Sequence, residues 1–196
     1  MHRYDEATAL IVVDVQNDFA DPGGSLAVAD AAGIIGHVNR EIAQATAAGA
    51  LVVLTQDWHP PVTPHFQKDG GIWPVHCLAD SWGAALHPDL LAPDDAPRVR
   101  KGVHGEDGYS GFMTRDPVSG EERPTELEGM LREESIERVV VVGLATDYCV
   151  KATALDAARL GFETSLVTDA IAAVDLAPGD GERAIEAMSD AGIEVW

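Results

Sequence analysis

Short, almost wholly apolar runs along the chain alternate with longer runs in which apolar residues recur every three or four positions. The apolar runs predict strands at residues 8–15, 51–55, 98–101, 139–142, 162–168 and 193–196. The helical runs cover residues 30–49, with Asp30 as N-cap, 88–91, 125–134, 147–160 and 179–191. This alternation predicts an α/β fold: a three-layer, open, mostly parallel sheet with helices on both faces, forming one domain over residues 1–196.

Polar residues that follow these strands are candidates for a site, because ligands of open α/β sheets bind beyond the carboxyl ends of the strands. Two long irregular segments, 56–82 and 102–124, and a connecting loop at 169–175 also follow strands. Loops of such length inside a compact domain are usually functional. We therefore expect convergence of the polar residues in these positions, which are Asp14, Asp57, His59, Lys101, Cys149 and Asp169.

The charge and the cysteine content narrow the classes of partner. The chain of 196 residues has a formal net charge of −20, and such a field repels phosphate backbones and anionic lipid, so we predict no nucleic-acid and no membrane partner. The chain has only two cysteines, which predicts reduced thiols. The N-terminal segment Met1–Glu6 lacks the basic region and following apolar run of an export signal, so we expect a cytoplasmic protein. A small-molecule partner is expected, and a homo-oligomer is left open.

Cys149 lies where the strand 139–142 turns into a helix. Unpaired N–H groups and the positive end of the helix dipole lower the pKa of a thiol there, so Cys149 is a candidate nucleophile. A small buried hydrophobic residue is an equally good interpretation of this stretch alone. Asp14 ends an apolar strand, where an unpaired carboxylate is costly, and Lys101 is a candidate partner for it. Asp14, Lys101 and Cys149 together could act as a proton acceptor, a cation and a nucleophile.

The segment Asp57-Trp58-His59 is a candidate metal site, because residues two apart in an extended chain project to the same side. His65 and His76, in the same irregular segment, could supply a third ligand. For the Asp-x-His pair alone, histidines that are hydrogen-bonded within a loop are the commoner alternative. Cys77 follows His76 directly, and we assign it to packing.

The combined motifs resemble the nicotinamidase/pyrazinamidase branch of the isochorismatase-like cysteine hydrolases. The resemblance runs from about Ala9 to the C-terminus and rests on Asp14-Val15-Gln16-Asn17-Asp18-Phe19, Asp57-Trp58-His59, Trp73-Pro74-x-His76-Cys77, Lys101-Gly102 and Gly143-x-Ala145-Thr146-Asp147-Tyr148-Cys149-Val150.

This resemblance implies the same fold and a set of roles for particular residues. The catalytic triad would be Asp14, Lys101 and Cys149. A cis peptide between Leu144 and Ala145 would direct the N–H groups of Ala145 and Cys149 at the oxyanion of the reaction. One divalent metal ion, Zn²⁺ or alternatively Fe²⁺ or Mn²⁺, would be bound by Asp57, His59 and His76, with His65 as a further ligand. The substrate-binding residues would be Phe19, Trp73, Tyr109 and Gln16.

The activity implied by the resemblance is hydrolysis of nicotinamide, and of pyrazinamide-like amides, to the acid and ammonia through a cysteine thioester, in NAD salvage. Two alternatives remain open at this stage. One is a related cysteine hydrolase that acts on another small amide, such as an N-carbamoyl compound or maleamate. The other is a non-catalytic α/β module in which the metal has a structural role.

Overall fold

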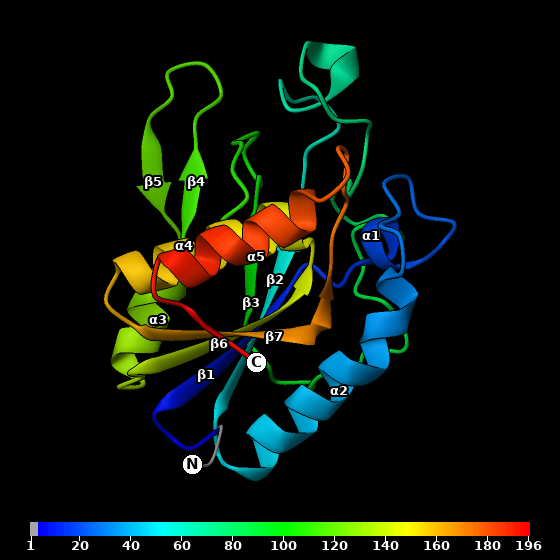
Figure 1. The fold of residues 1–196 in the computed structure, drawn as a ribbon. Coiled ribbons are helices and arrows are strands. Elements are labelled where there is room, and N and C mark those ends of the chain that lie inside the picture. Colours follow the sequence, from blue (N-terminus) through cyan, green and yellow to red (C-terminus); the bar gives the residue numbers. More distant parts are fainter. Residues whose placement is uncertain (1–3) are drawn as a thin grey trace.

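A six-stranded parallel sheet forms the centre of the computed structural model, which describes residues 4–196 (Figure 1). Its strand order is β3-β2-β1-β6-β7-β8, and every neighbouring pair is parallel. The predicted open parallel sheet is therefore confirmed. The strands are β1 (Thr8–Val13), β2 (Leu51–Asp57), β3 (Arg98–Lys101), β6 (Arg138–Leu144), β7 (Glu163–Ala172) and β8 (Glu194–Val195).

Helices cover both faces of the sheet, as the apolar periodicity predicts (Figure 1). Side chains of β1 alternate between two cores: Leu10 packs with the α2 side chains on one face, and Ile11 packs with α3, α4 and α5 on the other. This alternation follows from the two-residue period of a strand. The helices are α1 (Asn17–Ala20), α2 (Ala31–Ala47), α3 (Leu127–Glu133), α4 (Lys151–Arg159) and α5 (Asp180–Asp190).

The order of the strands sets the position of the site. From β1 the chain adds β2 and β3 on one side, and it then returns to add β6 on the other side of β1. Strand order therefore reverses between β1 and β6, where an open parallel sheet leaves a crevice at the carboxyl ends of its strands. Asp14 follows β1 and Cys149 follows β6, so both residues lie at this crevice.

Several predicted elements differ from the structure. Residues 88–91 form a turn rather than a helix, and Asp30 precedes α2 without a side-chain cap bond. The segment 102–124 was expected to be irregular, but it contains a hairpin formed by β4 (Met113–Arg115) and β5 (Glu122–Pro124). Strand β7 continues through residues 169–172, which were predicted to be loop. After a register shift between Val141 and Gly143 of β6, Ile171 and Ala172 pair with Gly143 and Leu144.

Two of the sequence predictions concern membranes and export. No helix within residues 4–196 has the length and apolar character needed to cross a membrane. Of the segment Met1–Glu6, whose composition argued against export, residues 1–3 lie outside the described residues.

Candidate active site

The ends of β1 and β3 and the turn after β6 bring Asp14, Lys101 and Cys149 together, as expected. Lys101 Nζ lies 2.7 Å from Asp14 Oδ2 and 3.4 Å from Cys149 Sγ. The same nitrogen lies 2.8 Å from Asp57 Oδ1 and donates to the Tyr109 carbonyl at 3.3 Å. One buried ammonium group thus joins two carboxylates, the thiol and the loop that follows β3.

Burial and pairing set the charges in this cluster. Burial raises the pKa of Asp14 more than the positive charge of Lys101 lowers it. Burial also raises the pKa of Asp57, but Lys101 and the contacts with His59 and His76 outweigh that effect and hold it well below its usual range. For Lys101, burial is outweighed by the two carboxylates, which raise its pKa well above the ordinary value. Lys101 therefore keeps its charge.

The environment of Cys149 corrects one expectation from the sequence. Burial, together with the charges of Asp14 and Asp57, raises the pKa of its thiol well above the ordinary value, although Lys101 opposes this. The residue lies in a π-helical turn, Thr146–Val150, and is 6% exposed. A helix start alone lowers the pKa of a thiol, but desolvation inside the crevice dominates here. Burial therefore favours the neutral form of the Cys149 thiol.

The turn before Cys149 has the backbone geometry that the resemblance implies. The Leu144–Ala145 peptide is cis. Gly143 has a φ of +111°, and a Cβ atom there would lie 2.1 Å from the Val13 carbonyl oxygen, so only glycine fits between β6 and β1. The Ala145 N–H donates to no acceptor among the described residues.

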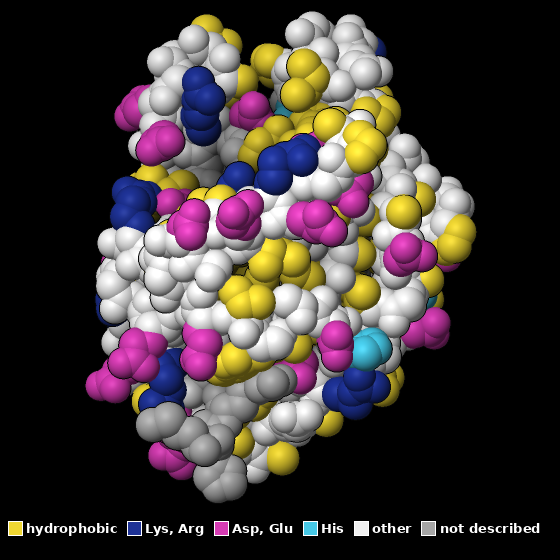
Figure 2. Space-filling model, viewed as in Figure 1, with side chains coloured by type: hydrophobic (Ala, Val, Ile, Leu, Met, Phe, Trp, Pro, Cys, Tyr) yellow, Lys and Arg dark blue, Asp and Glu magenta, His cyan; other side chains and the backbone are white. Residues whose placement is uncertain are grey.

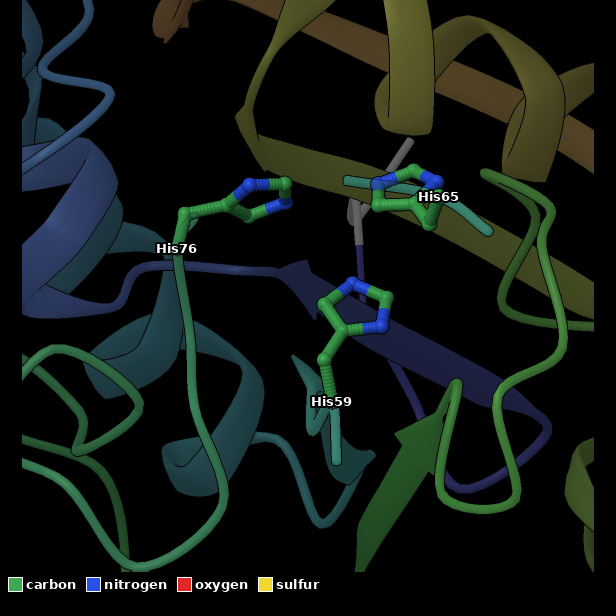
Figure 3. A group of neighbouring side chains, drawn as sticks. All are labelled: His59, His65 and His76. Carbon is green, nitrogen blue, oxygen red and sulfur yellow. The ribbon is translucent and has the colours of Figure 1, made fainter. Parts of the chain in front are cut away.

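Three histidine rings, those of His59, His65 and His76, surround a common space beside the triad (Figure 3). One nitrogen from each lies within 4.8 Å of the others, and all three side chains are buried. Asp57 Oδ2 lies 3.8 Å from Nε2 of His59 and 3.8 Å from Nε2 of His76. The structure thus brings together all four residues proposed as metal ligands.

Their hydrogen bonds fit a bound cation. His76 Nδ1 lies 2.8 Å from the Pro74 carbonyl oxygen and His65 Nδ1 lies 2.7 Å from Asp107 Oδ1, so the Nε2 atoms of both rings are available. Neither ring nitrogen of His59 has a hydrogen-bond partner among the described residues, although both are buried. An orphaned buried nitrogen is costly unless it binds a ligand. Imidazole and carboxylate donors suit Zn²⁺ and other divalent transition metals.

A cavity of about 410 Å³, including its open mouth, lies over the sulfur of Cys149 and the histidines. Figure 2 shows a hollow at the top of the view with hydrophobic side chains in it. Its walls hold many apolar and aromatic side chains and no Lys or Arg among the described residues. They comprise Phe19, Leu26, Val28, Asp57, His65, Trp73, His76, Tyr109, Leu144, Ala145, Tyr148, Cys149 and Val174.

Three of the four residues expected to bind substrate line this cavity: Phe19, Trp73 and Tyr109. Trp73 Nε1 donates to the Tyr109 hydroxyl at 3.1 Å, which fixes the two rings relative to each other. Tyr148 completes this wall, with its ring centroid 5.0 Å from that of Trp73 and 5.3 Å from that of Tyr109. Sequence reasoning missed Tyr148, although its position next to Cys149 was a usable signal.

Gln16 and Asp169 do not lie where the sequence predicted. Gln16 is absent from the cavity wall: its amide oxygen accepts from the Asp57 N–H and its amide nitrogen donates to the Asp57 carbonyl, each at 2.8 Å. It supports the backbone of Asp57 instead of contacting substrate. Asp169 is exposed on β7, 3.9 Å from His37 of α2, in the irregular part of the strand between Leu166 and Ile171.

Two further residues support the site and were not anticipated. The Thr55 hydroxyl donates to Asp14 Oδ1 at 2.6 Å, which leaves Asp14 held by Thr55 and Lys101. Asp18 accepts from the Cys77 N–H at 2.7 Å and so holds the turn that carries His76. Cys77 itself is fully buried in the core, which agrees with its assignment to packing.

The fold and its matched sequence define the class of protein. The profile of the isochorismatase domain matches residues 8–196, so the chain belongs to the isochorismatase family. It is similar to the nicotinamidase of Escherichia coli (strain K12), with 38% identity over 205 residues that cover 96% of this chain and 93% of that protein. The nicotinamidase/pyrazinamidase of Mycobacterium tuberculosis is also 38% identical, over 95% of this chain and 97% of its own.

A solved structure agrees with these relatives. The pyrazinamidase of Pyrococcus horikoshii, crystallised in complex with zinc, superposes with a TM-score of 0.86 and 41% identity, over 97% of this chain and 98% of that one. The resemblance to the nicotinamidase/pyrazinamidase branch is therefore confirmed.

Proposed function

We propose that this protein is an amidohydrolase that converts nicotinamide, and pyrazinamide-like amides, to the corresponding acid and ammonia. The observation that supports this most directly is the set of contacts made by Lys101. Its Nζ atom lies 2.7 Å from Asp14, 2.8 Å from Asp57 and 3.4 Å from the sulfur of Cys149. It joins a base, a nucleophile and a metal-binding carboxylate in one buried cluster. The reaction would return nicotinamide to NAD synthesis as nicotinic acid.

Cys149 would attack the amide carbon while Asp14 accepts the thiol proton. Lys101 Nζ lies 2.7 Å from Asp14 Oδ2 and 3.4 Å from Cys149 Sγ, so the same cation faces the negative charge whether it is on the carboxylate or on the sulfur. Asp14 then donates this proton to the nitrogen as the C–N bond breaks, and ammonia leaves. A water molecule deprotonated by Asp14 attacks the resulting thioester, which releases the acid and restores the thiol.

The negative charge on the carbonyl oxygen during each attack would be held by the N–H groups of Ala145 and Cys149. The Ala145 N–H is uncommitted among the described residues, and Ala145 lines the cavity beside the sulfur. A backbone donor of this kind contributes on the order of 3 kcal/mol to the stability of the transition state.

Asp57, His59 and His76, with His65 as the further ligand, would hold a divalent metal ion, for which Zn²⁺ is our first choice. When bound, the metal would supply a Lewis-acidic position for the ring nitrogen of the substrate. The protein's own contribution is to orient the ring: Phe19 and Trp73 line the cavity that the ring would enter, so that the carboxamide faces Cys149.

The cavity favours a neutral aromatic amide over the alternative substrates. Maleamate and N-carbamoyl amino acids carry a carboxylate, but no Lys or Arg among the described residues lines the cavity, and Lys101 is already engaged by two carboxylates. An unpaired carboxylate in such a site is costly. A neutral pyridine or pyrazine ring can instead stack within the aromatic wall.

Ammonia release tests this proposal with four amides: nicotinamide, pyrazinamide, benzamide and maleamate. We expect nicotinamide and pyrazinamide to be the good substrates, and benzamide to be poor because it lacks the ring nitrogen. Chelation should reduce activity and Zn²⁺ should restore it. Efficient hydrolysis of maleamate combined with none of nicotinamide would refute the assignment.

A further inference from the structure

We infer that Asp107 is a positioning residue for the metal site, acting through His65. The inference rests on the proposed function, because it concerns the metal-binding part of that site. It starts from one contact: His65 Nδ1 lies 2.7 Å from Asp107 Oδ1, and the His65 side chain is only 5% exposed.

The contact decides which nitrogen of His65 faces inward. With Nδ1 committed to the carboxylate, Nε2 is the nitrogen left for the space shared with His59 and His76 (Figure 3). The rings of His59 and His65 are stacked with centroids 4.6 Å apart, so rotation of His65 is also restricted from that side. A carboxylate on the outer nitrogen fixes both the tautomer and the orientation of an imidazole ligand and makes it a better donor.

Asp107 is itself held in place by its neighbours. Its backbone N–H and C=O form a reciprocal pair with Arg115 of β4, each bond 2.7 Å long. The Gly108 N–H donates to the same Oδ1 atom that faces His65, at 2.8 Å, which orients the carboxylate. Strand β4 of the hairpin thus positions Asp107, and Asp107 in turn positions His65.

The rest of the histidine cluster shows the same arrangement with a different acceptor. His76 has its Nδ1 2.8 Å from the Pro74 carbonyl oxygen. His59 Nδ1 has no hydrogen-bond partner within residues 4–196 and lies where a side chain on Gly102 would clash with it. Among the three histidines, only His65 has a hydrogen bond to another side chain within the described part of the chain. Asp107 is the residue through which a single substitution can change one ligand without altering the others.

Zn²⁺ affinity, measured by competition with a chromophoric chelator in the absence of substrate, tests the inference. Asp107→Ala should weaken Zn²⁺ binding by about 10–100-fold. Asp107→Asn should have a smaller effect, since its amide oxygen can still accept from His65 and from Gly108. The matched control is Glu106→Gln, which removes a charge from the adjacent position, where the carboxylate accepts a hydrogen bond from the His104 N–H. It should bind Zn²⁺ within about twofold of the wild type.

A double-mutant cycle separates action through His65 from a general disturbance of the loop. In a His65→Ala background, Asp107→Ala should have no further effect on Zn²⁺ affinity. Undiminished Zn²⁺ binding by Asp107→Ala would overturn the inference, and so would an equal loss in both backgrounds. The measurement uses no substrate, so failure of the wild type to hydrolyse nicotinamide would refute the proposed reaction and leave this result standing.

Discussion

Replacing Lys101 with methionine should destabilise the protein in a pH-dependent way. The substitution keeps much of the side-chain length but removes the one Lys or Arg, among the described residues, that pairs with Asp14 and Asp57, both of which are buried. Removing one partner of a buried ion pair costs about 3–5 kcal/mol. For a protein of this size that corresponds to a fall of roughly 6–20 °C in the unfolding temperature.

The dependence on pH follows from the carboxyl groups left behind. In Lys101→Met the pKa of Asp14, already raised by burial, should rise further because the opposing charge is gone. A carboxyl whose folded pKa lies above its unfolded value destabilises the fold fully above the folded pKa. The penalty shrinks as the pH falls below that value and is gone below the unfolded pKa. The deficit relative to the wild type should therefore be largest at pH 8 and shrink toward pH 5.

Urea unfolding of the metal-free proteins at pH 5, 6.5 and 8 measures this deficit. The matched control is Lys68→Met, which breaks an exposed pair with Asp69 and should cost less than about 1 kcal/mol at every pH. A deficit for Lys101→Met that is no larger than the control, or that does not change with pH, would refute the electrostatic account of the cluster. Ammonia release by Lys101→Met should also fall sharply at neutral pH, because Asp14 would then hold its proton.

Three further outcomes are expected. Asp57→Ala should lose the metal, since this carboxylate lies 3.8 Å from Nε2 of His59; unchanged metal content by elemental analysis would contradict its role. Gly102→Ala should weaken Zn²⁺ binding, because the new Cβ would lie 2.5 Å from His59 Nδ1. Competition with a chelator measures this affinity, and a value equal to that of the wild type would contradict the expectation. Iodoacetamide should modify Cys149 before Cys77, at a rate still rising above neutral pH because burial raises the thiol pKa; a rate that is constant from pH 6 to 9 would refute this.

The main features of the fold could be predicted because they depend on pattern alone. Uninterrupted apolar runs such as Val139–Val142 identify strands buried on both faces, and parallel strands bring their carboxyl ends to one edge. That reasoning was sufficient to place Asp14, Lys101 and Cys149 together before any distance was known. The aromatic wall, with Phe19, came from the family resemblance rather than from the pattern.

The remaining features depend on tertiary contacts that no local pattern contains. Gln16 was expected to bind substrate, but its side chain pairs with the backbone of Asp57, which lies 41 positions away in sequence. The pKa of Cys149 was expected to fall on the basis of its helix start, yet its desolvation depends on segments from the whole chain. Asp169 lies in the irregular part of β7 between Leu166 and Ile171, and register with β6 is a property of two strands.

Most acidic side chains lie outside the cavity wall. Acidic side chains lie along α5 on the face shown in Figure 2, and Asp180 pairs with Arg183 there at 2.6 Å. The cavity wall, in contrast, contains a single acidic residue, Asp57, among the described residues.

The central claim is that the sulfur of Cys149 forms the bond to the substrate. The most direct test is the rate of ammonia release from nicotinamide by Cys149→Ala, measured beside the wild type on protein loaded with Zn²⁺. The account predicts no release above background by the variant, together with retained Zn²⁺ and retained binding of nicotinamide, because the metal ligands and the aromatic wall are unchanged. Release at a rate near that of the wild type would contradict it.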